Sequence, residues 1–317
     1  MRGAFFHALL EVAEQDERVC LVVGDLGFGV VEEFARRFPK RFLNAGVAEQ
    51  NMTGIAAGMA LSGHVVFTYS IGNFPILRCL EQVRNDVCYH NANVKIVAVG
   101  GGLAYGSLGA SHHATEDLAI MRALPRMVVV APGDPVETAA ATRAVTEQAG
   151  PCYLRLGRAG EVKVHQTDID FHLGKAIEAR AGTDLTIIST GGMLATAMRV
   201  AELLEQSGTQ ARILSMHTVK PLDTASIEKG VRETGAIFTL EEHSLVGGLG
   251  GAVAEFLAET SEPPVIFKRF GLPSEFSSFV GSQEYIRGRH GLSGEALAVA
   301  IRAMLEKLQP LAEISNA

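Results

Sequence analysis

Residues 46–54 read Gly46-Val-Ala-Glu-Gln-Asn-Met-Thr-Gly54, and they lead into the segment 52–66, which reads MTGIAAGMALSGHVV. This segment contains no Asp, Glu, Lys or Arg, so Glu49 places a carboxylate at the start of a stretch that is expected to be buried. Burying a carboxylate is costly unless it is neutral or has a dedicated partner. Glu49 is therefore either an acid in the first turn of a helix, where it favours the helix dipole, or a functional carboxylate.

Short aliphatic runs alternate with segments of helical periodicity on both sides of this stretch. Nearly continuous aliphatic strands between helices indicate parallel sheets that are covered on both faces. Strands are predicted at Val19–Gly24, His64–Tyr69, Asn93–Gly100, Met127–Ala131, Cys152–Gly157, Asp184–Thr190, Ala211–His217, Ala236–Glu241 and Pro264–Phe270. Helices are predicted at Ala4–Asp16, Gly46–Leu61, Phe74–His90, Pro135–Gln148, Leu194–Gln206 and Ala252–Glu259.

The alternation predicts an α/β protein made of two doubly wound domains. A length of 317 residues also favours two domains over one. The polar segment Glu161–Leu173 is predicted to link them. We therefore expect the domains to cover residues 1–165 and 166–317.

Composition excludes several functions. The net charge of −7 and the lack of a Lys/Arg cluster make nucleic acid an improbable partner. No signal peptide and no apolar run of membrane-spanning length is recognised. The four cysteines are scattered and lack metal-site spacing, which predicts reduced core thiols in a cytoplasmic protein. They are Cys20, Cys79, Cys88 and Cys152.

Ligands of open parallel sheets bind beyond the carboxyl ends of the strands. Three segments are predicted there: Gly24–Gly29, the Glu49 segment and the glycine-rich loop Gly100–His113. None has GxGxxG spacing before a helix, the sequence GGLGG at 247–251 also fails that spacing, and no P-loop is present. The neighbouring His112 and His113 make a poor metal site without nearby carboxylates, so no residue is assigned to a metal.

Several motifs occur together along the chain. They are GVAEQNM and GIAAGMAL, then YSIGNF, then EQVRND, then GASHHATEDLAIMRALP and VVVAPGDP, and finally EEHSLVGGLGG. In this order and spacing the chain resembles the second half of a transketolase over essentially its whole length. The resemblance is greatest to split transketolases, in which one polypeptide carries the diphosphate-binding domain and another the pyrimidine-binding and C-terminal domains.

This resemblance implies thiamine diphosphate as cofactor and a role for Glu49. In such enzymes the matching Glu hydrogen-bonds a pyrimidine ring nitrogen, and the exocyclic nitrogen then takes the proton of the thiazolium carbon. Phe74 matches the aromatic residue that packs on the pyrimidine ring. Asp25 and Leu26 match the pair at the end of the first strand that borders the cofactor.

The resemblance also implies substrate-binding residues. Arg2 and Arg158 match arginines that bind the substrate phosphate, and Arg155 is a nearby alternative. His112 matches a histidine that contacts the sugar and polarises its carbonyl or hydroxyl group, so we assign it with Glu49 to catalysis.

The chain departs from the family at several of these positions. An aromatic residue is replaced by Ile71, for which Tyr69 could partly compensate. A serine on the phosphate is replaced by Gly29, a histidine by Gly100, and the aspartate that reads an acceptor hydroxyl by Leu108. These departures predict that the enzyme does not use the ordinary pentose-phosphate substrates with ordinary efficiency.

The Gly-Asp-Gly and Asn-Asn segments that hold magnesium diphosphate in the family are absent. The sequence Gly133-Asp134-Pro135 lacks the second glycine and lies in the other half of the enzyme. Mg²⁺ is therefore expected to be bound by a separately encoded N-terminal transketolase subunit in an α2β2 assembly. Apolar surfaces around Gly46–Ala60 and Phe74–His90 would form the interface.

Two alternatives stay open. Within the superfamily, the chain could be the β subunit of a 2-oxoacid dehydrogenase or a deoxyxylulose-phosphate-synthase-like protein. It could also be a non-catalytic regulatory subunit, although the retention of Glu49 and His112 argues against that. In the C-terminal domain, Glu241, Glu242 and His243 are interpreted as a solvated strand end.

Overall fold

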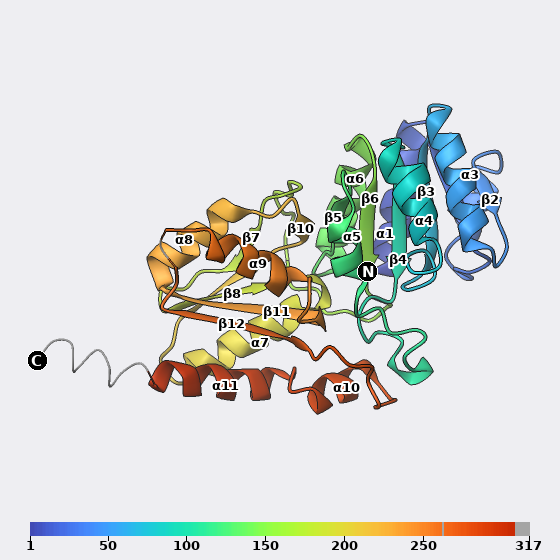
Figure 1. Ribbon diagram of the computed structural model, residues 1–317. Helices are drawn as coiled ribbons and strands as arrows, with labels where there is room; N and C mark the ends of the chain where they lie inside the picture. The colour runs from blue at the N-terminus through green and yellow to red at the C-terminus, as the bar shows by residue number, and fades with distance from the viewer. Residues whose placement is uncertain (262, 308–317) are drawn as a thin grey trace, which may run out of the picture.

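The computed structural model describes residues 1–261 and 263–307, and it contains two twisted sheets side by side (Figure 1). The first sheet has the order β10-β5-β6-β4-β3-β1-β2, and its strands are parallel except β10. Its strands are β1 (Val19–Val23), β2 (Phe42–Asn44), β3 (Val65–Ile71), β4 (Val94–Val99), β5 (Val128–Val130), β6 (Cys152–Leu156) and β10 (Thr218–Lys220).

Helices cover both faces of this sheet. One face packs against α1 (Arg2–Gln15), α2 (Glu32–Arg37) and α6 (Pro135–Glu147), whose apolar residues Phe5, Phe34 and Ala141 share a buried cluster with the strands. The other face packs against α3 (Glu49–Leu61), α4 (Leu80–Gln82), the π-helix η1 (Val83–Tyr89) and α5 (Asp117–Ala123). The strands are buried on both sides, as their unbroken aliphatic runs predict.

The second sheet has the order β12-β11-β8-β9-β7, with β7 antiparallel at one edge. Its strands are β7 (Ile177–Arg180), β8 (Leu185–Ser189), β9 (Ala211–Ser215), β11 (Ala236–Ser244) and β12 (Ile266–Leu272). One face packs against α7 (Leu194–Glu205), α10 (Gln283–Arg289) and α11 (Gly294–Glu306). The other packs against α8 (Thr224–Thr234) and α9 (Leu249–Ala258). The chain is therefore an α/β protein with two doubly wound sheets.

All nine predicted strands are confirmed, and β2, β7 and β10 are additions. These three are short edge strands, with too few residues for a clear apolar pattern. Strand β10 comes from the second half of the chain but pairs with β5 of the first sheet. The sheets therefore interlock, and the predicted boundary near residue 165 stays a prediction.

The predicted helix Phe74–His90 is wrong over its first half. Pro75 has no N–H to donate, and backbone bonds from Phe74 to Ile71 and from Ile76 to Asn73 form turns instead. The helical part begins only at Leu80 and continues as the π-helix η1. These turns leave the Phe74 ring half-buried at the end of β3.

The predicted linker Glu161–Leu173 packs against the first domain and is held there by hydrogen bonds. His165 Nε2 lies 2.8 Å from the buried Glu137 Oε1, and the backbone N–H groups of Val164 and His165 donate to Asp134 Oδ2. Phe171 packs against the core of the first sheet. None of the helices within residues 1–261 and 263–307 is both long and apolar enough to cross a membrane.

Candidate functional site

The sequence-predicted residues gather where β1, β3, β4 and β6 end (Figure 1). Parallel strands bring their carboxyl ends to one edge, so the loops that follow them meet there. Asp25 follows β1, Phe74 follows β3, the His112 loop follows β4, and Arg158 follows β6. The sheet thus positions residues that are far apart in sequence.

Glu49 is the first residue of α3, and it is only 1% exposed. Gly46 has a φ of +74° and Ala48 is not helical, so the helix begins at Glu49 and not at Gly46 as predicted. Arg78 Nη1 donates to Glu49 Oε2 over 2.7 Å, and Arg78 is itself about half exposed. Glu49 is therefore both an acid in the first helical turn and a buried carboxylate with a dedicated cation.

Gly24 lies within van der Waals distance of this carboxylate. A Cβ at Gly24 would lie 3.6 Å from Glu49 Oε1 and 3.6 Å from Ser70 Oγ. Ser70 Oγ is buried and has no hydrogen-bond partner among the described residues. A free carboxylate oxygen and a free hydroxyl thus flank one glycine, which suits a ring that carries hydrogen-bonding nitrogen atoms.

Aromatic contacts extend from Glu49 across the site. The Arg78 guanidinium carbon lies 5.2 Å from the centre of the Phe74 ring, and the Phe74 and His112 ring centres are 5.4 Å apart. Tyr105 follows at 6.3 Å from His112, and the guanidinium carbon of Arg158 lies 5.2 Å from the Tyr105 ring centre. A chain of contacts therefore runs from the buried Glu49 through Phe74 and His112 to Arg158.

The two adjacent histidines have different surroundings. His112 is half-buried, with Nδ1 3.0 Å from Ser111 Oγ, and its ring faces the site between Phe74 and Tyr105. His113 is 4% exposed, and its Nε2 lies 3.4 Å from the Gly106 carbonyl oxygen. The described residues contain no group of three or more His, Cys, Asp or Glu side chains arranged to hold a metal.

Asp25 and Leu26 border the Glu49 end of this chain of contacts. Asp25 adopts a φ of +56°, its N–H donates to Asn44 Oδ1, and Asn44 Nδ2 donates back to Asp25 Oδ1 over 2.9 Å. The Asn44 oxygen also accepts from the Gly46 N–H. Asn44 therefore ties the end of β1 to the turn before Glu49, while Leu26 packs on the core.

Of the three candidate arginines, Arg155 is not free for a substrate. It is 5% exposed, Nε donates to Asp117 Oδ2 over 2.7 Å, and Nη2 donates to the carbonyl oxygens of Ala114 and Glu242. Side chains of a strand alternate between its two faces, and both faces of this sheet are covered, so Arg155 is buried on β6. Arg158 lies past the end of β6 and is exposed. The prediction that Arg155 could bind the substrate phosphate is therefore wrong, and Arg2 and Arg158 remain the candidates for that role.

The interpretation of Glu241, Glu242 and His243 as a solvated strand end is wrong, because all three are at most 4% exposed. Strand β11 continues to Ser244 and passes under the loop of the first domain. Glu241 accepts from the N–H groups of Leu249 and Gly250, and burial raises its pKa to about 7 despite these bonds. The glycines of 247–251 make room for this helix cap and not for a nucleotide.

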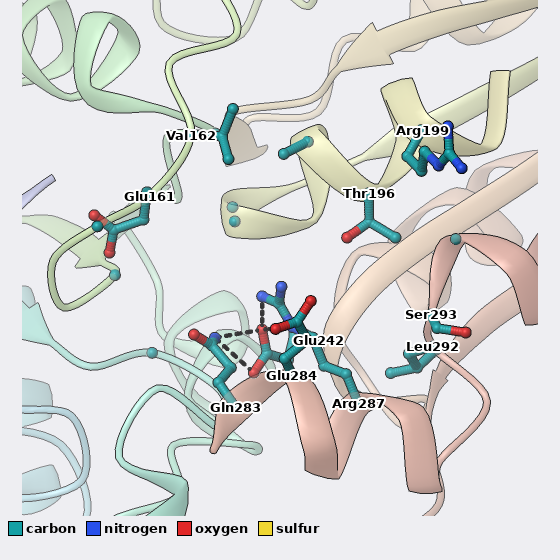
Figure 2. A pocket seen from close by; sticks show the side chains of 18 of the residues that line it. Glu161, Val162, Thr196, Arg199, Glu242, Gln283, Glu284, Arg287, Leu292 and Ser293 are labelled. Atoms are coloured by element: carbon teal, nitrogen blue, oxygen red, sulfur yellow. Dashed lines mark hydrogen bonds and ion pairs between the residues drawn. The ribbon is translucent and has the colours of Figure 1, made fainter. Parts of the chain in front are cut away.

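Glu242 joins the two domains. Its Oε1 accepts from the Leu103 N–H over 2.6 Å, and its carboxylate also accepts from Gln283 and Arg287. These contacts form one wall of an interdomain cavity of about 640 Å³, where Figure 2 shows Gln283 and Arg287 converging on Glu242. The loop that carries His112 is thus anchored to the C-terminal domain.

Comparison with known proteins agrees with this arrangement. Residues 1–160 match the transketolase pyrimidine-binding domain, and residues 174–290 match the transketolase C-terminal domain. The chain belongs to the transketolase family. It is 40% identical to one of the subunits of the apulose-4-phosphate transketolase of Phocaeicola vulgatus, over 96% of this chain and 97% of that protein.

Two further transketolase chains have similar lengths. A 6-deoxy-6-sulfo-D-fructose transketolase subunit, SqwH, of a Clostridium species is 37% identical over 97% of this chain and 95% of its own. A solved split-gene transketolase, described as an inactive beta4 tetramer, is 38% identical, has a TM-score of 0.86, and is matched over 95% of this chain and 96% of its own. Membership of this family implies thiamine diphosphate as cofactor.

Three residues of the site were not predicted from the sequence. Arg78 lies in a segment that was predicted to be a helix, Tyr105 lies in the glycine-rich loop but was not singled out there, and Glu242 comes from the other domain. Only the preference of arginines and tyrosines for ligand-binding surfaces could have pointed to the first two.

Proposed function

We propose that this chain is the second subunit of a two-component, thiamine-diphosphate-dependent transketolase that transfers a two-carbon ketol unit between anionic sugars. The observation that carries the proposal is the buried Glu49 carboxylate, which lies beside Gly24 and is linked by the chain of contacts to Phe74 and His112. This combination of carboxylate, aromatic ring and free polar atoms suits an aminopyrimidine.

In the proposed mechanism, Glu49 holds a pyrimidine ring nitrogen by a hydrogen bond, and Phe74 packs on the ring. When bound, the cofactor supplies the carbon nucleophile that carries the two-carbon unit. The buried position of Glu49 excludes water, which strengthens its hydrogen bonds. His112 binds the carbonyl or hydroxyl group of the sugar, Asp25 and Leu26 border the cofactor, and Arg2 and Arg158 hold the anionic end of the substrate.

The chain is proposed to supply only half of the site. An N-terminal subunit would bind Mg²⁺ and the diphosphate, in an α2β2 assembly. Exposed apolar residues on the α3 and η1 side agree with such an interface, and they include Val47, Leu61, Leu77 and Tyr89. Four buried, unpaired cysteines agree with a cytoplasmic enzyme.

Replacing Glu49 tests the proposal in the complex reconstituted with its N-terminal partner. Glu49→Gln should lower kcat for ketol transfer by about 100-fold or more, in line with general acid–base catalysis. The control is Glu147→Gln, an exposed acid at the end of α6 on the other face of the sheet, which should leave kcat unchanged. Unchanged ketol transfer by the Glu49→Gln complex would sink the catalytic assignment.

Substrate assays separate the alternatives. Acyl transfer from a 2-oxoacid to lipoate would support a 2-oxoacid dehydrogenase subunit, and condensation with pyruvate a deoxyxylulose-phosphate-synthase-like enzyme. Turnover of xylulose 5-phosphate and ribose 5-phosphate at usual transketolase rates would overturn the prediction of a non-standard sugar pair.

A further inference from the structure

Tyr105 occupies space that a side chain at position 100 would otherwise fill. A Cβ placed on Gly100 would overlap the Cε2 and Cδ2 atoms of Tyr105. Gly100 also has a φ of +88°, which side chains rarely adopt. The loop after β4 is therefore built so that the Tyr105 ring lies flush against its first turn.

The ring in turn supports a cation that has no carboxylate partner. The Arg158 guanidinium carbon lies 5.2 Å from the Tyr105 ring centre, within the range of a cation–π contact. Within residues 1–261 and 263–307, Arg158 makes no ion pair. The carboxylate closest in sequence, Glu161, is instead bound by the amino group of Met1 over 2.6 Å. Arg158 is thus exposed, oriented and available to an anion.

A second arginine approaches from α1. Arg2 Nε is buried and has no hydrogen-bond partner among the described residues. Burial raises the pKa of the Tyr69 hydroxyl, and the charge of Arg2 opposes that rise while Tyr105 adds to it. The family resemblance places Arg2, like Arg158, among the arginines that bind the substrate phosphate, and Tyr105 contacts Arg158.

We propose that Tyr105 is a specificity-determining residue of an anion-binding site for the phosphate or sulfonate end of a sugar. Its ring fixes Arg158, and its hydroxyl contributes to the same site. This inference rests on the proposed function, because it names the substrate class of that same site. Tyr105 packs between Arg158 and His112, so it links recognition of the anion to the residue that contacts the reacting end of the sugar.

The test compares phosphorylated and unphosphorylated ketose donors in the reconstituted complex. Tyr105→Leu should raise KM for the phosphorylated donor at least tenfold, and it should change KM for the unphosphorylated donor much less. Tyr105→Phe, which keeps the ring, should show a smaller rise. Arg158→Met should also raise KM for the phosphorylated donor, and the loss in the double variant should be smaller than the sum of the two single losses, because the ring acts through Arg158. Equal losses on both donors, or additive losses in the double variant, would overturn the proposal.

A binding measurement without turnover separates this inference from the proposed function. Inorganic phosphate should raise the Tm of the full chain, and Tyr105→Leu should abolish that shift. If the wild-type complex shows no ketol transfer but phosphate binding depends on Tyr105, the proposed function fails and the anion-binding role of Tyr105 stands. If ketol transfer occurs but Tyr105→Leu changes neither KM nor the Tm increase caused by phosphate, the anion-binding role fails and the proposed function stands.

Discussion

Among the described residues, Glu49 forms a hydrogen-bonded ion pair with Arg78, which also covers the Phe74 ring. The other carboxylate oxygen, Oε1, lies next to Gly24, 3.6 Å from the position of a Cβ there. A buried carboxylate needs such a partner, because an unpaired buried charge is strongly destabilising. Arg78 is therefore the residue that lets Glu49 be buried before a ligand arrives, and its long side chain can move aside because it is half exposed.

At the residue scale, Gly100→Ala should destabilise the chain. The new Cβ would meet the Tyr105 ring and the residue would keep a left-handed φ, so we expect the free energy of unfolding to fall by about 2–4 kcal/mol. Gly208→Ala is the matched control, because Gly208 has a φ of +83° with no atom within 4 Å of its Cβ position. Denaturant unfolding measures the free energy of unfolding of both variants. An equal decrease in the two would mean that the clash with the Tyr105 ring adds nothing to the cost of the left-handed φ.

At the scale of elements, the C-terminal domain holds the substrate loop of the first domain. Glu242 accepts from the Leu103 N–H, and the Ser244 N–H donates to the Thr115 carbonyl oxygen over 2.8 Å. A Cβ at Gly102 would clash with Glu242, so the loop and strand β11 are in direct contact. The position of the loop that carries Tyr105 and His112 therefore depends on contacts with the C-terminal domain.

Removing the Glu242 carboxylate should loosen this loop. In Glu242→Ala, Arg287 loses its buried partner and the Leu103 N–H loses its acceptor, which should cost about 3 kcal/mol and speed hydrogen exchange at Leu103. Glu284→Ala provides the control, since Glu284 lines the same cavity but is exposed. Unaltered exchange at Leu103 in Glu242→Ala would mean that other contacts hold the loop.

The contribution of the linker residue His165 to the stability of the chain should depend on pH. The hydrogen bond with Glu137 raises the pKa of His165 above 6.5. Burial would raise the pKa of Glu137, but the hydrogen bond from His165 and further partners hold it below its usual value. Nearby His217 is neutral in this range, because burial lowers its pKa to about 4.

We therefore expect His165→Asn to destabilise the chain more at about pH 6 than at about pH 9. The His165 contribution is fully present below the unfolded pKa near 6.5 and is lost as the pH rises through the raised folded pKa. Tm of the two proteins across pH measures the effect. His172→Asn, in an exposed pair of the same linker, should cause no pH-dependent difference. A decrease in Tm for His165→Asn that is the same at every pH would contradict a charged pair between His165 and Glu137.

At the scale of the whole molecule, the apolar side chains that remain exposed on the α3 and η1 side have no partner within the described chain. Helix α3 lies at the end of the first domain that is farther from the second domain (Figure 1). The sequence contains Glu49, the carboxylate proposed to contact the cofactor, but it lacks the Gly-Asp-Gly and Asn-Asn segments proposed to hold magnesium diphosphate. Both features fit a chain that completes its site by assembly.

Leu77→Arg should weaken that assembly. Leu77 is 50% exposed beside the Phe74 turn, and a charge in an apolar interface should raise the Kd for the partner subunit more than about tenfold. Analytical ultracentrifugation measures the complex. Val265→Arg is the control, because Val265 is 76% exposed in the other domain. Wild-type affinity in Leu77→Arg would place the interface elsewhere.

The sequence by itself determined the two parallel α/β sheets, because aliphatic runs of strand length have few other ways to be buried. Its motifs also determined the family and the positions of Glu49, Phe74, His112 and Arg158. Only the tertiary structure decided that Arg155 and the acids of β11 are buried, that Arg78 and Tyr105 join the site, and that the domains share a strand. These features depend on contacts between residues far apart in the chain, and local patterns of polarity carry no information about such contacts.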